Sequence, residues 1–208
     1  MNVDVKSAIQ TGDAGTLRRL LDEDRTLANT VIVWGKRSEL HTHPLHYISD
    51  MLFDGTLQRG KEMPVLEALL AAGADCNHHA ANGETPLIGA ASLGAEDLGL
   101  RLLDAGARPD AQGGFGETAL HWAANLGLHR LVAGLIESGG DIHLKDARYN
   151  SSPLGWALHG RFRSSWGGQG HFPEVVALLV HAGATVEPEW LRDEQIRADS
   201  SILSALGV

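Results

Sequence analysis

Histidines are the side chains of this sequence that come closest to a metal-binding pattern. The chain contains 11 of them, and the segment "HTHPLH" places His41, His43 and His46 close together, with His78 and His79 further along. Zinc requires three or four ligands that converge as a tetrahedron. These histidines fall on expected turns and helix ends, so convergence does not follow from their spacing. We therefore expect no metal and no cofactor, and whether this cluster binds a metal stays open.

Common catalytic motifs are missing from the sequence. It has no G-x-S-x-G, no G-x-x-x-x-G-K-[ST] and no H-E-x-x-H. The glycine-rich "WGGQG" at 166–170 lacks the strand–loop–helix setting that a phosphate site needs. Adjacent acidic residues such as Glu96 and Asp97 are typical of a solvated helix face. We expect no enzymatic activity.

Composition restricts the classes of partner and the location. The chain has 208 residues, of which 43% are hydrophobic, and its 26 acidic and 17 basic residues give a formal net charge of −9. Such a chain can bury a sizeable core, but an acidic chain binds nucleic acid and anionic membranes poorly. Its one cysteine, Cys76, cannot form an intrachain disulfide, which favours a reducing compartment. Without a signal-peptide pattern or an apolar run of membrane-spanning length, we expect a cytoplasmic protein.

The elements that would position any binding residue follow an internal repeat. Two short markers recur, and most of their copies start 33 or 34 residues apart. Two independent markers that share a period near 33 indicate a stack of similar units. The first marker is "HPLH" at 43–46, "TPLI" at 85–88, "TALH" at 118–121 and "SPLG" at 152–155, and the second is "GAD" at 73–75, "GAR" at 106–108, "GGD" at 139–141 and "GAT" at 183–185.

Each unit contains the signals for two helices. Thr or Ser at 85, 118 and 152 can cap the first helix, and proline at 44, 86 and 153 then occupies its first position. Small alanines follow, which let neighbouring helices approach closely. The second helix has apolar residues at i, i+1, i+4 and i+5, which form one broad face. Glycine at 73, 106, 139 and 183 ends that helix as a C-cap residue.

This pattern resembles the ankyrin repeat family. The segments at 116–143 and 83–110 carry its T-P-L-H-x-A signature and period most closely, while His43 replaces the family's Thr and Gly155 replaces its His. The resemblance implies an all-α ankyrin repeat solenoid of about five helix-turn-helix units, with short β-turn fingers and a C-terminal helical cap. One domain over 1–208 would comprise a degenerate N-terminal capping repeat (1–34), a repeat with an inserted loop (38–78), two regular repeats (80–112 and 113–146), a second repeat with an inserted loop (147–187) and the C-terminal cap (188–208).

Two units are longer than the others at the same place. From the first marker to the second there are 21 residues in the units that start at 85 and 118, but 30 and 31 in those that start at 43 and 152. The extra residues belong to the turn between the two helices. They would place two loops on one edge of the stack, which is often a binding face. The second loop brings Arg161, Arg163 and Trp166 as candidate contacts, and whether the loops bind a partner or only pack stays open.

The resemblance also implies that partners meet the finger tips and the concave face of the first helices. On the tips, the matching positions are Glu84, Phe115, Glu117, Arg148 and Tyr149. Exposed aromatic residues are common interface anchors. On the first helices the matching positions hold Tyr47, Gly89, Trp122 and Trp156, and the glycine could leave a cleft beside it. The alternative is that Trp122 and Trp156 stack on each other and support the core.

The function that we expect is non-catalytic recognition of another protein, by a monomer that binds neither nucleic acid nor membranes. The concave face, the finger tips and the two inserted loops would make the contacts. Two alternatives remain. One is an inhibitor or immunity-type protein that blocks an enzyme, for which the acidic charge would suit a basic target. The other is a binder of a small molecule or metal in the concave groove.

Overall fold

Paired helices make up most of the chain. The computed structural model describes residues 2–35, 40–163 and 170–208. Along these residues five helix pairs follow one another, each folded back on itself as a helical hairpin. The pairs are α1 (Asn2–Thr11) with α2 (Ala14–Glu23), α3 (Pro44–Phe53) with α4 (Glu62–Ala71), α5 (Pro86–Ser92) with α6 (Glu96–Asp104), α7 (Ala119–Asn125) with α8 (His129–Glu137), and α9 (Pro153–Arg163) with α10 (Phe172–His181).

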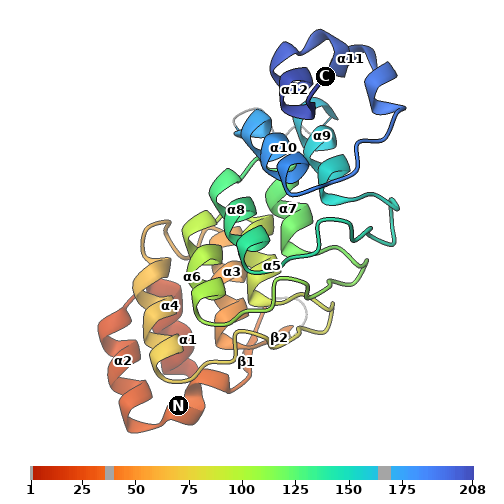
Figure 1. Cartoon of the computed structure of the whole chain (residues 1–208). Helices are drawn as coiled ribbons and strands as arrows, with labels where there is room; N and C mark the ends of the chain where they lie inside the picture. The colour runs from red at the N-terminus through yellow and green to blue at the C-terminus, as the bar shows by residue number, and fades with distance from the viewer. Residues whose placement is uncertain (1, 36–39, 164–169) are drawn as a thin grey trace.

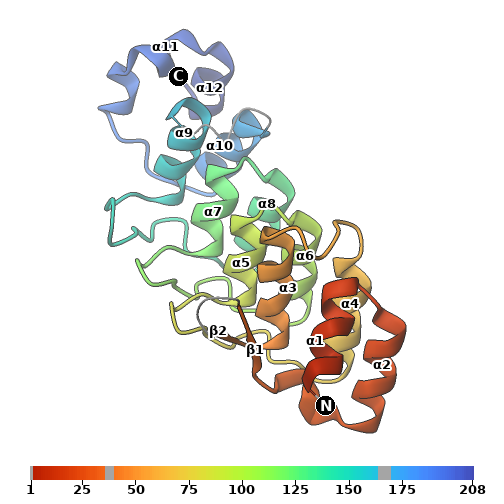
Figure 2. The same ribbon diagram turned by 180° about the vertical axis from the view of Figure 1, so that it is seen from behind.

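The pairs stack into an elongated, two-layered array (Figure 1). The first helices of successive pairs pack side by side in one layer and the second helices in the other, which Figure 2 shows from behind. The N- and C-termini lie at opposite ends of the stack, and the segments that join one pair to the next project as fingers on one side. The expectation of a helical solenoid of about five units is confirmed.

The first finger contains the strands of the fold. After the 3-10 helix η1 (Arg25–Asn29), strands β1 (Ile32–Trp34) and β2 (Leu40–Thr42) pair antiparallel, with Ile32 opposite Thr42. The sequence predicted β-turn fingers but not this two-stranded ladder. Ile32 is buried, and the Trp34 ring packs edge-on against Tyr47 with centroids 5.5 Å apart, so the hairpin also covers part of the core.

Glycines end the second helices as predicted. Gly73, Gly106, Gly139 and Gly183 all adopt a left-handed backbone, with φ between +87° and +101°. The residue after each one turns its N–H back to a helix carbonyl; after Gly73, for example, Ala74 donates to Leu69 O at 3.0 Å. This closure satisfies carbonyls that the helix end would otherwise leave unpaired.

Several of the first helices begin with a proline or with a side-chain cap. Thr85 accepts the Ile88 N–H at its hydroxyl, at 3.3 Å, and Thr118 forms a capping box with His121. His43 makes no such bond at the start of α3, which agrees with its departure from the pattern. Pro44, Pro86 and Pro153 each open a helix at the position where a missing N–H costs nothing.

The core lies between the two helix layers. On α4, α8 and α10, three of the four predicted apolar positions are buried and the fourth is half-buried, as with Leu131, Val132, Leu135 and Ile136 in α8. The alanines of the first helices, such as Ala90 and Ala123, are 0% exposed. Their small size lets adjacent units approach, so that stacking supplies the buried surface that no unit has alone.

The inserted residues lengthen the first helices as well as the turns. Helices α3 and α9 have 10 and 11 residues, against 7 in α5 and α7. In the first enlarged unit the connection 54–61 then packs back on the array, because Leu57 is 1% exposed and the Lys61 ammonium donates to Thr11 O at 3.3 Å. The connection of the first enlarged unit therefore packs on the array.

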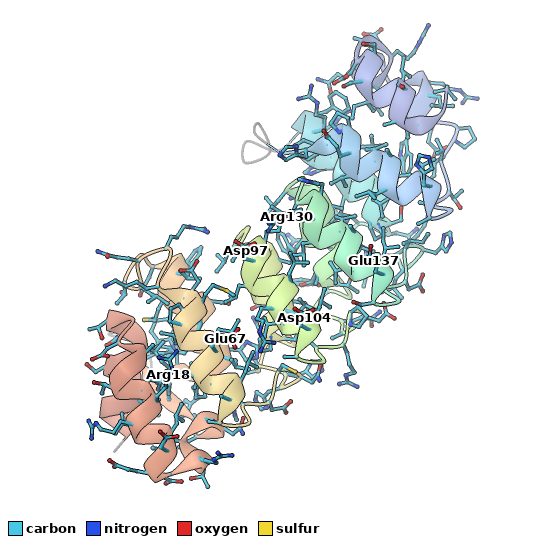
Figure 3. All side chains as sticks on the ribbon, turned by 60° about the vertical axis from the view of Figure 1, so that its left-hand side comes forward. Arg18, Glu67, Asp97, Asp104, Arg130 and Glu137 are labelled. Atoms are coloured by element: carbon cyan, nitrogen blue, oxygen red, sulfur yellow. The ribbon has the colours of Figure 1, made fainter. Side chains whose placement is uncertain are left out.

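Ion pairs join successive second helices on the outer face (Figure 3). Arg101 of α6 donates to both carboxylate oxygens of Glu67 in α4, at 2.6 and 3.1 Å, and Arg130 of α8 pairs with Glu96 and Asp97 of α6.

At the C-terminal end, η2 (Trp190–Arg192), α11 (Glu194–Ala198) and α12 (Ser200–Leu206) cover the last unit. The expected C-terminal helical cap is thus present as two helices, preceded by a 3-10 turn.

Candidate functional site

A buried carboxylate shapes the finger that precedes α9. Asp146 is 2% exposed, and its Oδ1 accepts the backbone N–H groups of Arg148 at 2.9 Å and Tyr149 at 2.7 Å. Its Oδ2 accepts the Ser151 N–H at 3.2 Å and the Trp156 indole N–H at 3.0 Å. Burial alone would raise the pKa of Asp146, but these donors outweigh it and the pKa is lowered, so the group stays ionised. The finger is held rigid by one side chain.

Exposed aromatic rings and an arginine cluster at the tips of two neighbouring fingers. Phe115 is 58% exposed and Tyr149 is 64% exposed. The Arg148 guanidinium carbon lies 5.2 Å from the Phe115 ring centroid and 5.4 Å from that of Tyr149, which is within cation–π range of both. The Glu117 carboxylate accepts the Phe115 N–H at 2.9 Å and so holds the backbone of the finger that carries Phe115. The structure thus brings together four of the tip residues that the sequence named.

Two adjoining cavities on the concave side contain the aromatic positions of the first helices. One has a volume of about 260 Å³, and the other, of about 400 Å³, shares Trp122, Tyr149 and Trp156 with it. The Trp122 and Trp156 rings meet edge to face with centroids 5.2 Å apart, and both are half-buried. They therefore stack on each other and line the surface at once. We call this surface the aromatic groove; its ring side chains are Phe115, Trp122, Tyr149 and Trp156.

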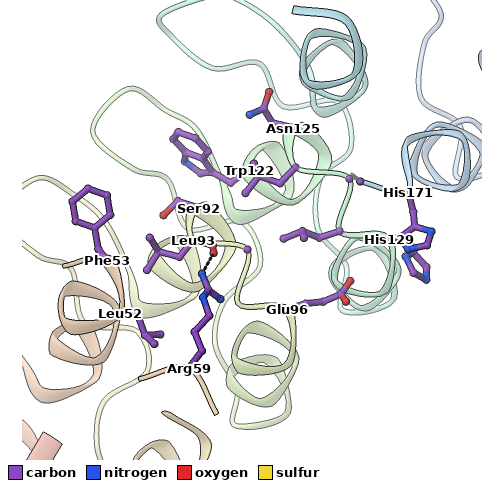
Figure 4. A pocket seen from close by; sticks show the side chains of 15 residues that line it. Leu52, Phe53, Arg59, Ser92, Leu93, Glu96, Trp122, Asn125, His129 and His171 are labelled. Carbon is purple, nitrogen blue, oxygen red and sulfur yellow. Dashed lines mark hydrogen bonds between the residues drawn. The ribbon is translucent and has the colours of Figure 1, made fainter. Parts of the chain in front are cut away.

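A larger cavity lies along the turns between the two helices of successive pairs (Figure 4). Its volume is about 780 Å³, and residues of both enlarged units contribute to it. Phe53, at the end of α3, is 77% exposed, and the Arg59 guanidinium donates to Leu93 O at 2.9 Å. On the other side the His171 ring lies over that of His129, with centroids 4.3 Å apart. We call this the edge cavity.

The floor of the edge cavity is made by residues that the sequence analysis did not single out. Ser92, Leu93, Asn125 and His129 come from the turns of the two regular units and the helix ends beside them. The spacing of the two markers could have predicted this cavity. Two short turns that lie between two long ones leave a depression, and the short turns form its floor. Trp122 lines both this cavity and the aromatic groove, which makes it the ring common to the two surfaces.

Comparison with known proteins now adds the family. A family model described as ankyrin repeats, in three copies, matches residues 56–146. Residues 56–146 carry ankyrin repeats. Ankyrin repeats generally serve as protein–protein interaction modules and are typically non-catalytic. No curated protein matches the chain in sequence. Among the residues that the structure describes, no helix is long and apolar enough to cross a membrane.

Tyr47 is a correction to the predicted set of surface residues. It occupies the same position in its ankyrin unit as Trp122 and Trp156, but it is 0% exposed. Its hydroxyl accepts a hydrogen bond from the Gln10 amide of α1 at 2.8 Å, and burial raises its pKa to about 12. Helix α1 and the β1–β2 hairpin cover this position, whereas the two tryptophans face the groove. A partner cannot reach Tyr47 in the folded domain.

Gly89 does not open a cleft. It is buried in α5, and a Cβ placed there would lie 3.0 Å from the Ser49 hydroxyl oxygen and 3.2 Å from its Cβ. The glycine is needed for the close approach of α5 to α3. This is a packing role, and the small-residue gap that we expected in the groove is filled by the neighbouring ankyrin unit.

The two arginines of the second insertion are already paired within the chain. The Arg161 guanidinium donates to Asp199 at 3.1 and 2.8 Å, and that of Arg163 donates to Asp193 at 2.9 Å. Both carboxylates also cap helices, Asp193 for α11 and Asp199 for α12. The arginines therefore fasten the C-terminal cap to α9. Trp166, the third candidate of this loop, lies outside the described residues, and Glu84 is half-buried at the wall of the aromatic groove.

Four of the histidines make contacts between neighbouring units. His46 and His121 tie neighbouring fingers together, with Nε2 at 3.0 Å from His78 O and 3.2 Å from Ser151 O. The His43 and His78 rings stack with centroids 3.5 Å apart. Within residues 2–35, 40–163 and 170–208, no group of three or more histidine, cysteine or acidic side chains could hold a metal ion.

Proposed function

We propose that this ankyrin domain is a non-catalytic recognition module whose protein partner binds the finger tips and the aromatic groove. The observation that carries the proposal is the exposed set of Phe115, Arg148 and Tyr149 at the mouth of that groove. Aromatic residues are enriched among the side chains that supply most of the binding free energy at protein interfaces, and large exposed apolar side chains are otherwise disfavoured in a monomer.

The rigidity of the fingers supports this assignment. Asp146 fixes the backbone on either side of Tyr149 as well as the indole of Trp156, and Glu117 fixes the backbone of Phe115. A surface that is already ordered loses less conformational entropy when a partner binds. The backbone at Phe115 and Tyr149 and the side chain of Trp156 are thus held by hydrogen bonds before a partner binds.

The edge cavity is a second contact surface in this proposal. Its wall carries Phe53, the most exposed of the large hydrophobic side chains in the described part of the chain. A partner that reached around the first helices would cover this ring and the apolar floor at Leu93 and Leu128. The second surface is separable from the first, because Phe53 makes no contact with the fingers that a substitution would disturb.

The proposal is tested by quantitative capture from an extract of the cells that make the protein, followed by mass spectrometry. Tagged wild type is compared with Phe115→Ala/Tyr149→Ala and, separately, Phe53→Ala. Since interface anchors contribute more than about 1 kcal/mol each, the double variant should bind the captured partner at least about 10-fold more weakly. Its thermal midpoint should stay near the wild-type value, because both rings are exposed.

The matched control is Arg18→Ala/Glu137→Ala, which changes two residues of the outer layer that Figure 3 labels. This variant should retain the wild-type affinity for the same partner. If Phe115→Ala/Tyr149→Ala binds that partner as tightly as the wild type does, the finger tips are not the binding surface and the proposal fails.

A further inference from the structure

The charged side chains that line the smaller cavity of the aromatic groove are mostly acidic. Glu84, Glu117 and Asp146 contribute three carboxylates and Arg148 one guanidinium, which leaves a formal charge of −2 on the lining. The hydrogen-bond partners of these carboxylates are neutral. They are backbone N–H groups, the Trp156 indole and the Asn82 amide. Such donors stabilise a carboxylate but do not cancel its charge, so the cavity keeps a negative potential.

Four aromatic rings line the same 260 Å³ cavity as the three carboxylates. The face of an aromatic ring carries the negative part of its quadrupole and attracts cations. Trp122, Tyr149 and Trp156 are held edge to face, with centroids 5.2 and 6.1 Å apart, so that ring faces of different orientation border one space. Rings and carboxylates therefore favour the same kind of ligand, a cation with an apolar stem.

A cation from the chain itself already occupies the rim. The Arg148 guanidinium lies over Phe115 and Tyr149, and within the described residues it forms no ion pair with a carboxylate. Its attachment to the tip is thus a cation–π contact with two exposed rings. This contact shows that the geometry of the rim accepts a guanidinium. An exposed arginine side chain has a long, flexible stem, so its head can leave the rings when another cation arrives.

We propose that the aromatic groove binds a cationic side chain, lysine or arginine, of a basic segment of the partner. The inference rests on the proposed function, and it specifies the chemistry of what that surface recognises. The whole chain carries a net charge of −9, which would steer a basic partner toward it. An acidic partner would instead place its charge beside three carboxylates, with Arg148 alone to offset them. In this arrangement Arg148 is a competitor that the incoming cation displaces.

The probes are n-butylammonium, n-butylguanidinium and, for the opposite charge, n-butyrate, each titrated into the ¹⁵N-labelled full chain. Binding is followed by NMR at the indole N–H signals of Trp122 and Trp156, assigned with single Trp→Phe variants. Both cations should shift these signals saturably, with a Kd on the order of 1–10 mM, as expected for one cation against two or more ring faces. The tighter of the two cations identifies the partner's side chain as lysine or arginine. Butyrate should bind at least about 10-fold more weakly.

The decisive variant is Arg148→Ala, because the two signs of ligand charge predict opposite effects. If the site takes a cation, removing the resident cation should tighten binding of the preferred probe, by roughly 3- to 10-fold. Glu84→Gln should weaken it by roughly 3-fold, since the lining loses one negative charge. Arg18→Ala, on the outer layer, changes the net charge equally and should leave the Kd within about 1.5-fold of wild type, because exposed charges that far apart are screened.

Three outcomes overturn the inference: no saturable shift with either cation, tighter binding of butyrate than of the cations, or weaker cation binding in Arg148→Ala. These failures are separate from failure of the proposed function. If partner capture still depends on Phe115 and Tyr149 while the cations do not bind, the surface is correct and its assigned chemistry is wrong. If cations bind but capture does not depend on these rings, the cavity recognises a cation in another context.

Discussion

Protonation of His46 should weaken the ankyrin fold as the pH falls from 7.5 to 5. The imidazole is 6% exposed and spans two fingers through its Nε2, 3.0 Å from His78 O. Burial is the main reason that its pKa is lowered to about 4, against the opposing effect of the hydrogen bond to His78. In the unfolded chain the pKa of histidine is about 6.5. Between these two values the unfolded chain binds a proton that the folded chain does not, so acid favours unfolding.

The size of the effect follows from the two pKa values. At pH 5 the lowered pKa of His46 reduces the free energy of unfolding by about 2 kcal/mol. This reduction reaches its full value of about 3 kcal/mol below pH 4. Above pH 7.5 the contribution is essentially zero, because neither state binds the proton.

Asp50 opposes this trend. Burial is the first cause of a pKa raised to about 6, with Glu84 and Asp54 acting in the same direction. Its folded carboxyl therefore takes up a proton before the unfolded one does, which stabilises the fold as the pH falls from 6 toward 3.8. At pH 5 this gain is on the order of 1 kcal/mol, so the wild type alone should show a shallow pH dependence.

The assay is urea unfolding followed by far-UV circular dichroism at pH 7.5, 6 and 5. His46→Gln keeps an N–H donor but does not titrate. Its free energy of unfolding should be lower than that of the wild type at pH 7.5, and this difference should shrink by about 2 kcal/mol at pH 5, because only the wild type is destabilised by acid at this position. Asp50→Asn should behave in the opposite way, with its free energy of unfolding falling relative to wild type as the pH is lowered. A difference between His46→Gln and wild type that stays constant over this range would refute the assignment of a buried, neutral imidazole.

Three further substitutions test how the array is held together. Gly127→Ala would place a Cβ 2.6 Å from a backbone atom of the second enlarged unit, whereas a Cβ at Gly139, also in a left-handed conformation, would meet nothing within 4 Å. In thermal melting, Gly139→Ala should therefore destabilise the fold by about 1–2 kcal/mol and Gly127→Ala by clearly more. Asp199→Ala removes the N-cap of α12 and should cost about 1–2 kcal/mol and speed limited proteolysis at the C-terminal cap. Trp156→Phe leaves an oxygen of Asp146 without its indole donor and should lower the free energy of unfolding in urea by about 1–3 kcal/mol. Trp156→His, whose imidazole can donate to the same oxygen, should lower it less.

Local chemistry made much of the fold predictable. Proline at a helix start and glycine at a helix end act through the backbone of their own unit, so Pro86 and Gly106 could be assigned without knowing any neighbour. The insertions were found by counting residues between two such markers. The lengthening of α3 and α9 was not found, because the extra residues can extend a helix or a turn, and packing against the next unit decides between these.

The site was less predictable because it depends on contacts between units. Tyr47, Trp122 and Trp156 occupy equivalent positions, yet Tyr47 is covered by α1 and the β1–β2 hairpin, whose interaction no repeat pattern encodes. Asp146 was missed for a related reason. A carboxylate in a finger is common in any sequence, and its importance appears only when four donors are seen to converge on it.

The inserted segments pack on the array and also form the walls of a cavity. The His171 N–H donates to Gly127 O at 2.9 Å, and the Arg59 guanidinium donates to Leu93 O at 2.9 Å, so each enlarged unit is bonded to one of the regular units between them. That same attachment forms the walls of the edge cavity, with Phe53 left 77% exposed on one of them. Shortening the loops would therefore remove the cavity and the packing together, and a loss of partner binding in such a variant would have two explanations. Phe53→Ala removes only the exposed ring, so partner capture by this variant separates recognition at the edge cavity from support of the array.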